Sequence, residues 1–302
     1  MLARLGHSAS SLISRSSRAF AHAIAGEAAL DRWICDSEKK GITLSETLHT
    51  DRVSDLYITL PTRDGTTRPY VRPKNSEALG FGHHLAFFHP RTPERHLRAD
   101  GTETDFCPPE PFVRRMWAGG RMEWRKPLII GGKACARANV SSVHKKGFEG
   151  GAPMVFVNQH IEIQNEGEEE SAVLEERSHV YLALGTYRRT ARDGKPRLGH
   201  LSKPYLYRTS DDNAVFRIWC VSAHGLPSPD FSLEFAPSPT TLFRFSALTF
   251  NGHHIHLDRD YARNSEGYPG VAISRDLWAI FVRSQACYRK SQSGSYMGHS
   301  RL

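Results

Sequence analysis

Hydrophobic and polar positions alternate most clearly in the middle of the chain. Residues 121–124, 134–143 and 154–163 each place apolar side chains at about every second position, which is the spacing of a half-buried strand. Residues 173–182 are predicted to return as another strand. The charged residues 166–171 separate the last two runs and predict a hairpin turn. The pattern therefore predicts a set of long antiparallel strands.

Two stretches before these strands have different patterns. Residues 27–56 carry apolar positions at helical spacing and predict one helix followed by a turn. Residues 57–110 are rich in Pro, Gly and His and predict loop with short extended pieces. A helix followed by antiparallel strands predicts an α+β domain over residues 27–186.

Residues 187–225 form a basic segment that predicts a linker or an insertion. The segment has few acids and contains Arg188, Arg189, Arg192, Lys195, Arg197, Lys203 and Arg208. Residues 216–221 within it have a strand-like pattern but no clear partner. A solvated loop explains this charge without a nucleic acid, and an RNA site is the alternative.

The ordered pattern resumes at residue 226 and leads to the most informative run of the chain. Residues 242–250 alternate enough to predict a strand, with Arg244 as the polar exception. Gly252 then permits a sharp turn. On this prediction His256 emerges just past a strand end, where loop residues can meet a cleft.

The run Asn251-Gly-His-His-Ile-His256 supplies groups that can relay protons. The imidazole of His256 titrates near neutral pH and is a candidate general acid or base. The amide of Asn251 is suited to orient a water or hold a thioester oxygen. Asp258 and Asp260 follow and are candidates to orient a His tautomer; a surface or capping histidine is the other interpretation.

Three closely spaced histidines also raise the possibility of a metal site. His253, His254 and His256 do not fall on one side of a strand, and no nearby Cys completes a ligand set. We therefore predict no metal at this position.

Together with Ser265-Glu-Gly-Tyr-Pro-Gly270, this run resembles the active-site signature of the MaoC-like hydratases and dehydratases. It is most similar to the mitochondrial type-two hydroxyacyl-thioester dehydratases. The sequence Phe-Asn-Gly-His resembles that subgroup, whereas the broader family has an Asp at the position of Asn251. The segments Arg114-Arg-Met-Trp-Ala-Gly-Gly-Arg-Met-Glu123, Met154-Val-Phe-Val and Glu176-Arg-Ser-His-Val-Tyr181 carry the same resemblance.

The resemblance implies a double hot-dog fold, in which an antiparallel sheet wraps a central helix. Residues 27–186 would form the N-terminal hot dog and residues 226–302 part of a C-terminal one. It also implies His256 and Asn251 as catalytic residues. The substrate-binding residues implied by it are Gly252, Arg115, Trp117 and Tyr268; core packing and a surface Arg remain the alternative for Arg115 and Trp117.

The resemblance ends at Gly270. The family continues with a His-Gly-Pro-Leu motif, whose helix N-terminus would polarise the thioester carbonyl. Here Gly270 is followed by Val-Ala-Ile-Ser-Arg-Asp-Leu277, and the remaining residues have little strand pattern. We therefore expect the second hot dog to be incomplete, as in a C-terminally truncated relative.

Composition and charge narrow the possible partners. Hydrophobic residues make up 39% of the chain and charged residues 24%, a soluble globular balance, and no apolar run approaches the roughly 18–20 residues of a membrane span. The net charge of +8 is concentrated at the ends: residues 1–26 contribute +3 and residues 275–302 contribute +4, which leaves +1 between them. This distribution argues against a nucleic-acid partner.

The first 26 residues have the composition of a mitochondrial presequence. They contain Arg4, Arg15 and Arg18, many Ser and Ala, and no acid; a disordered tail is the alternative. The five cysteines lie too far apart for a zinc or redox motif and are expected to be small buried residues of a reducing compartment. They are Cys35, Cys107, Cys135, Cys220 and Cys287.

The resemblance implies dehydration of (3R)-hydroxyacyl thioesters to trans-2-enoyl thioesters in mitochondrial fatty-acid synthesis, in the matrix. It implies no metal or redox cofactor, an acyl carrier protein or coenzyme A thioester as substrate, and a possible homodimer. A catalytically inactive relative that binds acyl carriers or partner subunits is the second hypothesis. An RNA-binding protein that uses residues 187–210 is the third.

Overall fold

The computed structural model describes residues 26–60, 70–183, 208–210, 213–218, 233–235, 237–268, 270–272 and 299–301. A helix over residues 26–37 comes first. The larger sheet contains β1 (Gly41–Thr47), β2 (Phe112–Trp124), β3 (Lys133–Lys146), β4 (Met154–Asn165), β5 (Val173–Ala183) and β9 (His299–Arg301). The smaller sheet contains β6 (Arg208–Ser210), β7 (Asn213–Ile218) and β8 (Leu233–Phe235). The helices and helical turns that follow residue 37 are α2 (Thr50–Thr59), η1 (His83–Ala86), η2 (Glu94–His96), α3 (Pro239–Leu248), η3 (His254–His256) and η4 (Tyr261–Ser265).

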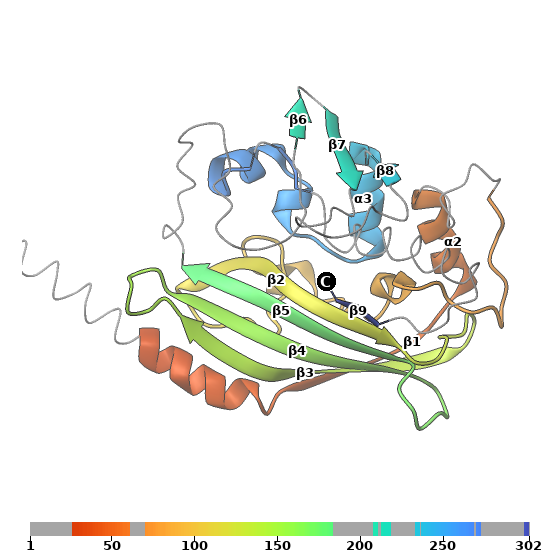
Figure 1. The fold of residues 1–302 in the computed structure, drawn as a ribbon, viewed down its shortest axis with the longest axis horizontal. Helices are drawn as coiled ribbons and strands as arrows, with labels where there is room; N and C mark the ends of the chain where they lie inside the picture. Colours follow the sequence, from red (N-terminus) through yellow and green to blue (C-terminus); the bar gives the residue numbers. More distant parts are fainter. Residues whose placement is uncertain are drawn as a thin grey trace, which may run out of the picture.

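The larger sheet has the strand order β1-β3-β4-β5-β2-β9, and its neighbouring strands pair antiparallel (Figure 1). The strands predicted from alternation are β3, β4 and the last third of β2, and the strand predicted to return after the charged turn is β5. In β4 every second side chain is buried, from Val155 to Ile163, which is the period of a strand with one face on a core. The α+β class and the antiparallel strands are therefore confirmed for the described part of the chain.

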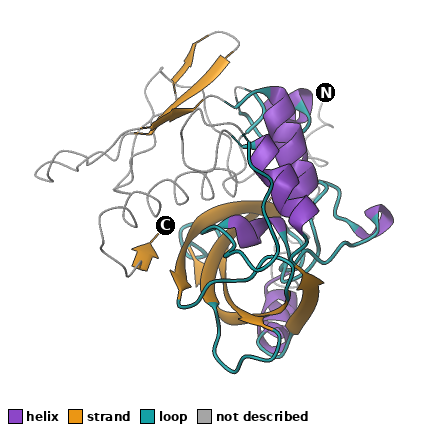
Figure 2. Ribbon diagram, turned by 90° about the vertical axis from the view of Figure 1, so that its right-hand side faces the viewer, coloured by secondary structure: helices purple, strands orange, loops and turns teal. Residues whose placement is uncertain are grey.

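Two hydrophobic clusters cover the inner face of this sheet at its two ends. The first joins α2, the loop around η1 and α3 to the sheet through residues such as Leu56, Phe87 and Phe245. The second places Leu30 of the helix over residues 26–37 against Val155 and nearby residues of the sheet. Figure 2 shows how strongly the sheet curves around this inner face.

The region predicted as one helix and a turn contains more structure than expected. The helix over residues 26–37 is followed by β1, which pairs with β3 from Gly41↔Asn139 to Thr47↔Lys133, and then by α2. Ile42 and Leu44 alternate with exposed polar residues in β1, so a strand pattern was hidden between two helices. Of the residues 57–110 predicted as loop, residues 57–59 belong to α2, and residues 70–110 are mostly loop with two short helical turns.

The strand predicted over residues 242–250 is wrong, because this run belongs to helix α3. Leu242, Phe245, Ser246 and Thr249 are buried while Phe243 and Phe250 are exposed, which is a 3.6-residue period. The start signal lies just before it: the Ser238 hydroxyl accepts a hydrogen bond from the Thr241 N–H, and a proline occupies the first turn.

Several predictions concern residues that the structure does not describe. These are residues 1–25 of the presequence predicted over residues 1–26, most of the basic segment 187–225 and most of the C-terminal residues after 272. The strand-like run predicted within the basic segment does have backbone partners, because β7 pairs with both β6 and β8. In the described part of the chain, no helix has the length and apolar character needed to cross a membrane.

Candidate active site

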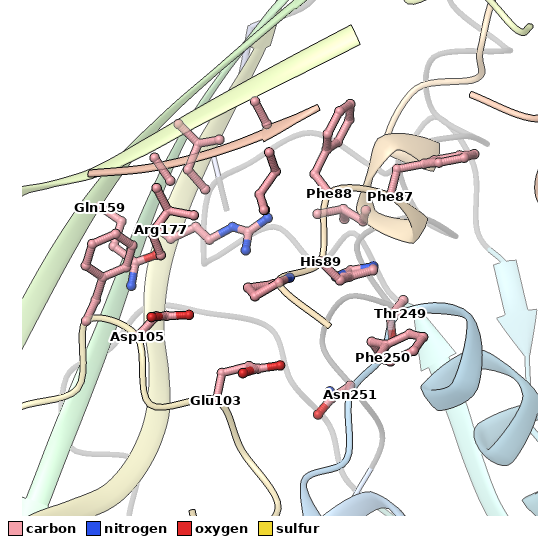
Figure 3. A pocket seen from close by; sticks show the side chains of 18 of the residues that line it. Phe87, Phe88, His89, Glu103, Asp105, Gln159, Arg177, Thr249, Phe250 and Asn251 are labelled. Atoms are coloured by element: carbon pink, nitrogen blue, oxygen red, sulfur yellow. The ribbon is translucent and has the colours of Figure 1, made fainter. Parts of the chain in front are cut away.

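A cavity of about 220 Å³ lies between the inner face of the larger sheet and the loops that cover it. Its apolar floor is formed by side chains of β1, β3 and β4: Ile42, Leu44, Ala136, Ala138, Ile161 and Ile163. Its other walls come from the loop after η1, from residues 101–106 and from residues 249–252, which follow α3 (Figure 3). The cavity thus combines an apolar surface with polar groups from distant parts of the chain.

Strand register explains the polar end of this cavity. Gln159 of β4 pairs with Arg177 of β5, and His179 of β5 lies two residues further along the same face. Arg115 of β2 also lines the cavity. Residues two apart on a strand share a face, so these polar residues gather at one end of the cavity and the apolar residues at the other.

Residues 100–103 are held directly against the loop that follows α3. The His254 N–H donates to the Asp100 carbonyl over 2.9 Å. A Cβ on Gly252 would lie 2.9 Å from the Gly101 carbonyl oxygen, so the two backbones approach more closely than side chains allow. This close approach, not a turn conformation, is why Gly252 must be a glycine.

We expect Gly101→Ala to lower the free energy of unfolding by at least about 2 kcal/mol. Gly101 has φ +79°, and a Cβ there would lie 2.2 Å from the Gly252 carbonyl oxygen, so backbone strain of about 1–2 kcal/mol adds to an overpacking cost of about 1–3 kcal/mol. Gly151→Ala is the matched control, since Gly151 has φ +71° but no atom within 4 Å of its Cβ position. Urea unfolding of both variants measures the difference; equal losses would contradict the close approach.

The turn after α3 brings Asn251 to the cavity wall. Thr249 ends the helix with its hydroxyl donating to the Phe245 carbonyl, and Phe250 adopts φ 49°, the left-handed conformation of a helix C-terminus. The Asn251 N–H returns to the Ser246 carbonyl over 2.9 Å, and the Asn251 side-chain oxygen accepts from the His253 N–H over 3.2 Å. Figure 3 shows Asn251 at the edge of the cavity beside Phe250.

His256 lies in the next turn, η3, and does not line the cavity. Its Nδ1 is 2.7 Å from the Ala272 carbonyl oxygen. A carbonyl only accepts, so Nδ1 carries the proton and Nε2 is left as the acceptor of the neutral ring. The prediction that Asp258 orients this ring is not supported, because the Asp258 carboxylate accepts from the Asp260 and Tyr261 N–H groups.

His253 is the more buried imidazole of this run. Its Nε2 lies 3.9 Å from an Asp100 carboxylate oxygen, and its ring meets the His256 ring edge-on at 5.6 Å. Burial lowers the pKa of His253 to about 3, although the Asp100 charge acts to raise it. The Asp100 pKa lies below its ordinary value, because hydrogen bonds from Thr102 and the charge of Arg98 outweigh the effect of burial. His253 therefore stays neutral at physiological pH.

Two of the predicted substrate-binding residues line the cavity and two do not. Arg115 and Gly252 line the cavity together with Asn251. Trp117 does not line the cavity. Its ring packs edge-on against the ring of His179, which does, and the two ring centroids are 5.3 Å apart. Tyr268 lies outside the cavity lining, and its N–H donates to the Ala262 carbonyl over 2.9 Å.

A buried carboxylate that sequence reasoning missed supports the polar wall. Glu175 is fully buried, and its two oxygens receive hydrogen bonds from Arg177 Nε at 2.6 Å and Arg177 Nη2 at 3.0 Å. His84 Nε2 lies 3.4 Å from the same carboxylate. Alternation within β5 puts Glu175 on the inner face, which was a signal that a charge would be buried there.

A second missed interaction crosses the chain between distant segments. Arg114 of β2 donates from Nε to a Glu266 carboxylate oxygen at 2.5 Å and from Nη2 to the Glu266 carbonyl at 3.0 Å. Both side chains are almost buried, at 12% and 10% exposed. Nothing in the local sequence connects two positions so far apart.

The described residues contain no group of three or more His, Cys, Asp or Glu side chains placed to hold a metal ion. His254 instead packs edge-on against Tyr261 at 5.2 Å, so the three histidines of the run do not converge. Of the cysteines described, Cys107 and Cys135 are half-buried, but Cys35 is exposed, which corrects the expectation that it is a small buried residue.

Comparisons with known proteins agree on one family. A family model for hydroxyacyl-thioester dehydratase type 2 matches residues 82–201 and 206–293. The mesaconyl-C(4)-CoA hydratase of Chloroflexus aurantiacus is 32% identical over 211 residues, covering 69% of this chain and 64% of that protein. The mitochondrial hydroxyacyl-thioester dehydratase type 2 of Schizosaccharomyces pombe is 26% identical over 204 residues, covering 65% and 63%. The chain thus spans slightly less than two thirds of each relative.

Among solved structures, a MaoC-like dehydratase from Phytophthora capsici is similar with a TM-score of 0.47 at 14% identity, covering 83% of this chain and 75% of that one. A Mycobacterium tuberculosis protein described as having a double hotdog fold is similar with a TM-score of 0.41 at 12% identity, covering 82% and 73%.

Proposed function

Because this chain belongs to the hydroxyacyl-thioester dehydratase type 2 family, we propose that it removes water reversibly from 3-hydroxyacyl thioesters. The observation that supports this most directly is the position of Asn251 and Gly252, which form one wall of a cavity with an apolar floor. An acyl chain is suited to such a floor, since burying its methylene groups is favourable. The thioester and hydroxyl would then lie beside Asn251 and Gly252.

We assign the proton transfer at the substrate C2 to His256. Its Nδ1–H is held by the Ala272 carbonyl over 2.7 Å, so Nε2 is the basic nitrogen, and the thioester acidifies the proton that it would remove. The ring lies one turn beyond the cavity wall, which would place the reacting carbons at the Asn251 end of the cavity. The Asn251 amide would hold the substrate hydroxyl or thioester oxygen.

The more specific proposal is the conversion of (3R)-hydroxyacyl thioesters to trans-2-enoyl thioesters in mitochondrial fatty-acid synthesis. Its support is the presequence-like composition of residues 1–26 and the mitochondrial name of the Schizosaccharomyces pombe relative. We propose a thioester of an acyl carrier protein or of coenzyme A as substrate, the matrix as location, and a homodimer as the assembly.

Hydration of crotonyl-coenzyme A by the purified chain tests the function. We expect His256→Ala to reduce kcat by roughly 10²–10⁴, the usual contribution of general acid–base catalysis. Phe243→Ala is a control, since Phe243 is an exposed residue of the preceding helix, outside the cavity, and it should keep the parent rate.

Two results would contradict this proposal. A folded parent chain without hydratase activity would support the alternative, a relative that binds acyl carriers without turnover. Full activity in His256→Ala would remove His256 from the mechanism while leaving the reaction itself in place.

A further inference from the structure

Glu103 places a carboxylate in the cavity lining. This residue lies outside the sequence motif, and the proposed mechanism gives it no role so far. It lies on the loop between η2 and β2 and lines the cavity opposite Asn251 (Figure 3). Its Oε2 is buried, and no hydrogen-bond donor of the described residues reaches it. The other carboxylate of the cavity, Asp105, is exposed, so Glu103 is the one placed in a partly desolvated position.

The loop that carries Glu103 is held in place by its own backbone. The Arg98 N–H donates to the Thr102 carbonyl and the Gly101 N–H to the Arg98 carbonyl, each over 2.8 Å. The Asp100 carboxylate accepts from the Thr102 N–H and hydroxyl, and the Cys107 thiol donates to the Glu103 carbonyl over 3.3 Å. These contacts fix the backbone at Glu103 without using its carboxylate.

The same loop is attached to the segment that carries Asn251 and His256. The His254 N–H donates to the Asp100 carbonyl, and Gly101 and Gly252 touch backbone to backbone. These contacts therefore fix the position of Glu103 relative to the predicted catalytic segment, although about 150 residues separate the two along the chain. Movement of one loop would move the other.

The chemistry requires a group of this kind. Removing water takes two proton transfers, one from C2 and one to the oxygen on C3, and the amide of Asn251 does not exchange protons at neutral pH. Leaving a carboxylate oxygen buried without a donor is unfavourable. A substrate hydroxyl or an attacking water in the cavity would supply the missing donor.

We propose that Glu103 is the second acid–base residue of this site, a role that rests on the proposed dehydratase function. In dehydration, His256 Nε2 takes the proton from C2, and the C–H electron pair forms the C2=C3 double bond. The C3–O bond breaks with its electron pair on oxygen, and the carboxylic acid of Glu103 gives that oxygen its proton, so water leaves. The imidazolium then returns a proton to the carboxylate through solvent.

In hydration the steps are reversed. The Glu103 carboxylate takes a proton from water as the water oxygen bonds to C3, and the imidazolium of His256 protonates C2. The reaction balances without an oxidant, a metal or a further reactant. Glu103 therefore acts at the oxygen on C3 and His256 at C2.

Glu103→Gln, Glu103→Ala and the control Glu94→Gln test this assignment through crotonyl-coenzyme A hydration. Glu103→Gln keeps the shape and removes the proton transfer, so we expect kcat to fall by roughly 10²–10⁴ with KM within about threefold. Glu94→Gln, at an exposed residue of η2 outside the cavity lining, should keep kcat within about threefold. Sodium formate should restore part of the activity of Glu103→Ala, whereas sodium chloride at the same ionic strength should not.

Formate rescue keeps the test independent of folding defects, because only a folded site can use the added carboxylate. An active parent together with a Glu103→Gln rate within threefold of it would overturn the role of Glu103 and leave the function standing. The same conclusion would follow if Glu103→Ala lost activity and formate did not restore it. An inactive parent would overturn the function and the role of Glu103 together.

Discussion

Glu175→Gln is expected to lower the free energy of unfolding by about 3–5 kcal/mol, the usual cost of removing one partner of a buried ion pair. Glu175 is fully buried, and the substitution would leave the guanidinium of Arg177 and the imidazole of His84 without their shared anion. Replacing both partners by apolar groups would cost less, because the penalty comes from the charge left behind.

Glu176→Gln is the matched control. Glu176 is the next residue of β5, but it points to the opposite face and is exposed, so its replacement should change the free energy of unfolding by less than about 0.5 kcal/mol. Urea unfolding at pH 7 measures both variants. Similar small losses would mean that the Glu175–Arg177 pair contributes little to folding.

The effect of Glu175→Gln should also depend on pH in a defined direction. Burial acts to raise the pKa of Glu175, but the charge of Arg177 and the hydrogen bonds from His84 and Arg177 outweigh it and hold the pKa well below 4.5. A carboxyl whose folded pKa is depressed contributes stability above its unfolded pKa and loses it as the pH falls toward the folded value. The difference between parent and variant should therefore be constant above about pH 5 and shrink below about pH 4.5.

The parent protein should lose stability in acid through His253 as well. Its folded pKa of about 3 lies below the ordinary 6.5, so the unfolded chain binds a proton first and stability falls as the pH drops below 6.5. This loss is common to parent and variant, so the difference between the two at each pH isolates Glu175.

Arg114→Ala is the second change with a large expected effect. It should lower the free energy of unfolding by about 3–5 kcal/mol and also lower the activity. The Arg114 side chain bonds both the carboxylate and the carbonyl of Glu266 and is only 12% exposed. Glu266 follows η4, which packs against η3, the turn that carries His256. Loss of this connection should loosen the segment that carries His256. We expect kcat/KM for crotonyl-coenzyme A hydration to fall at least tenfold, because small displacements of the proposed catalytic group His256 would be costly.

Arg121→Ala is the control for this prediction. Arg121 lies on the same strand and pairs with Glu123 at 3.1 Å, but its side chain is 41% exposed, and exposed ion pairs contribute about 0–1 kcal/mol. A double-mutant cycle with Glu266→Ala isolates the coupling between Arg114 and Glu266. A coupling no larger than that of the exposed pair would show that the connection does not hold the segment.

Local alternation was a good guide where one strand face meets a core and the other does not. It identified β3 and β4 because each alternates over about ten residues, long enough for a period of two to stand out, whereas β5 was predicted as the strand that returns after the charged turn. The same test failed at residues 242–250, where six apolar residues in nine also satisfy a helical period. The capping sequence Ser238-Pro239 was the local signal that should have decided the assignment.

The chain's sequence by itself determined the antiparallel strands, the α+β class and the family to which the chain belongs, because each depends on patterns within short segments. The roles of His256 and Asn251 remain predictions that rest on such a pattern. Only the tertiary structure decided that Asn251 and Gly252 line a cavity while His256 does not, that Glu103 faces this cavity, and that Arg114 holds Glu266. These relations join residues roughly 150 positions apart, and packing, which depends on the whole fold, brings them together.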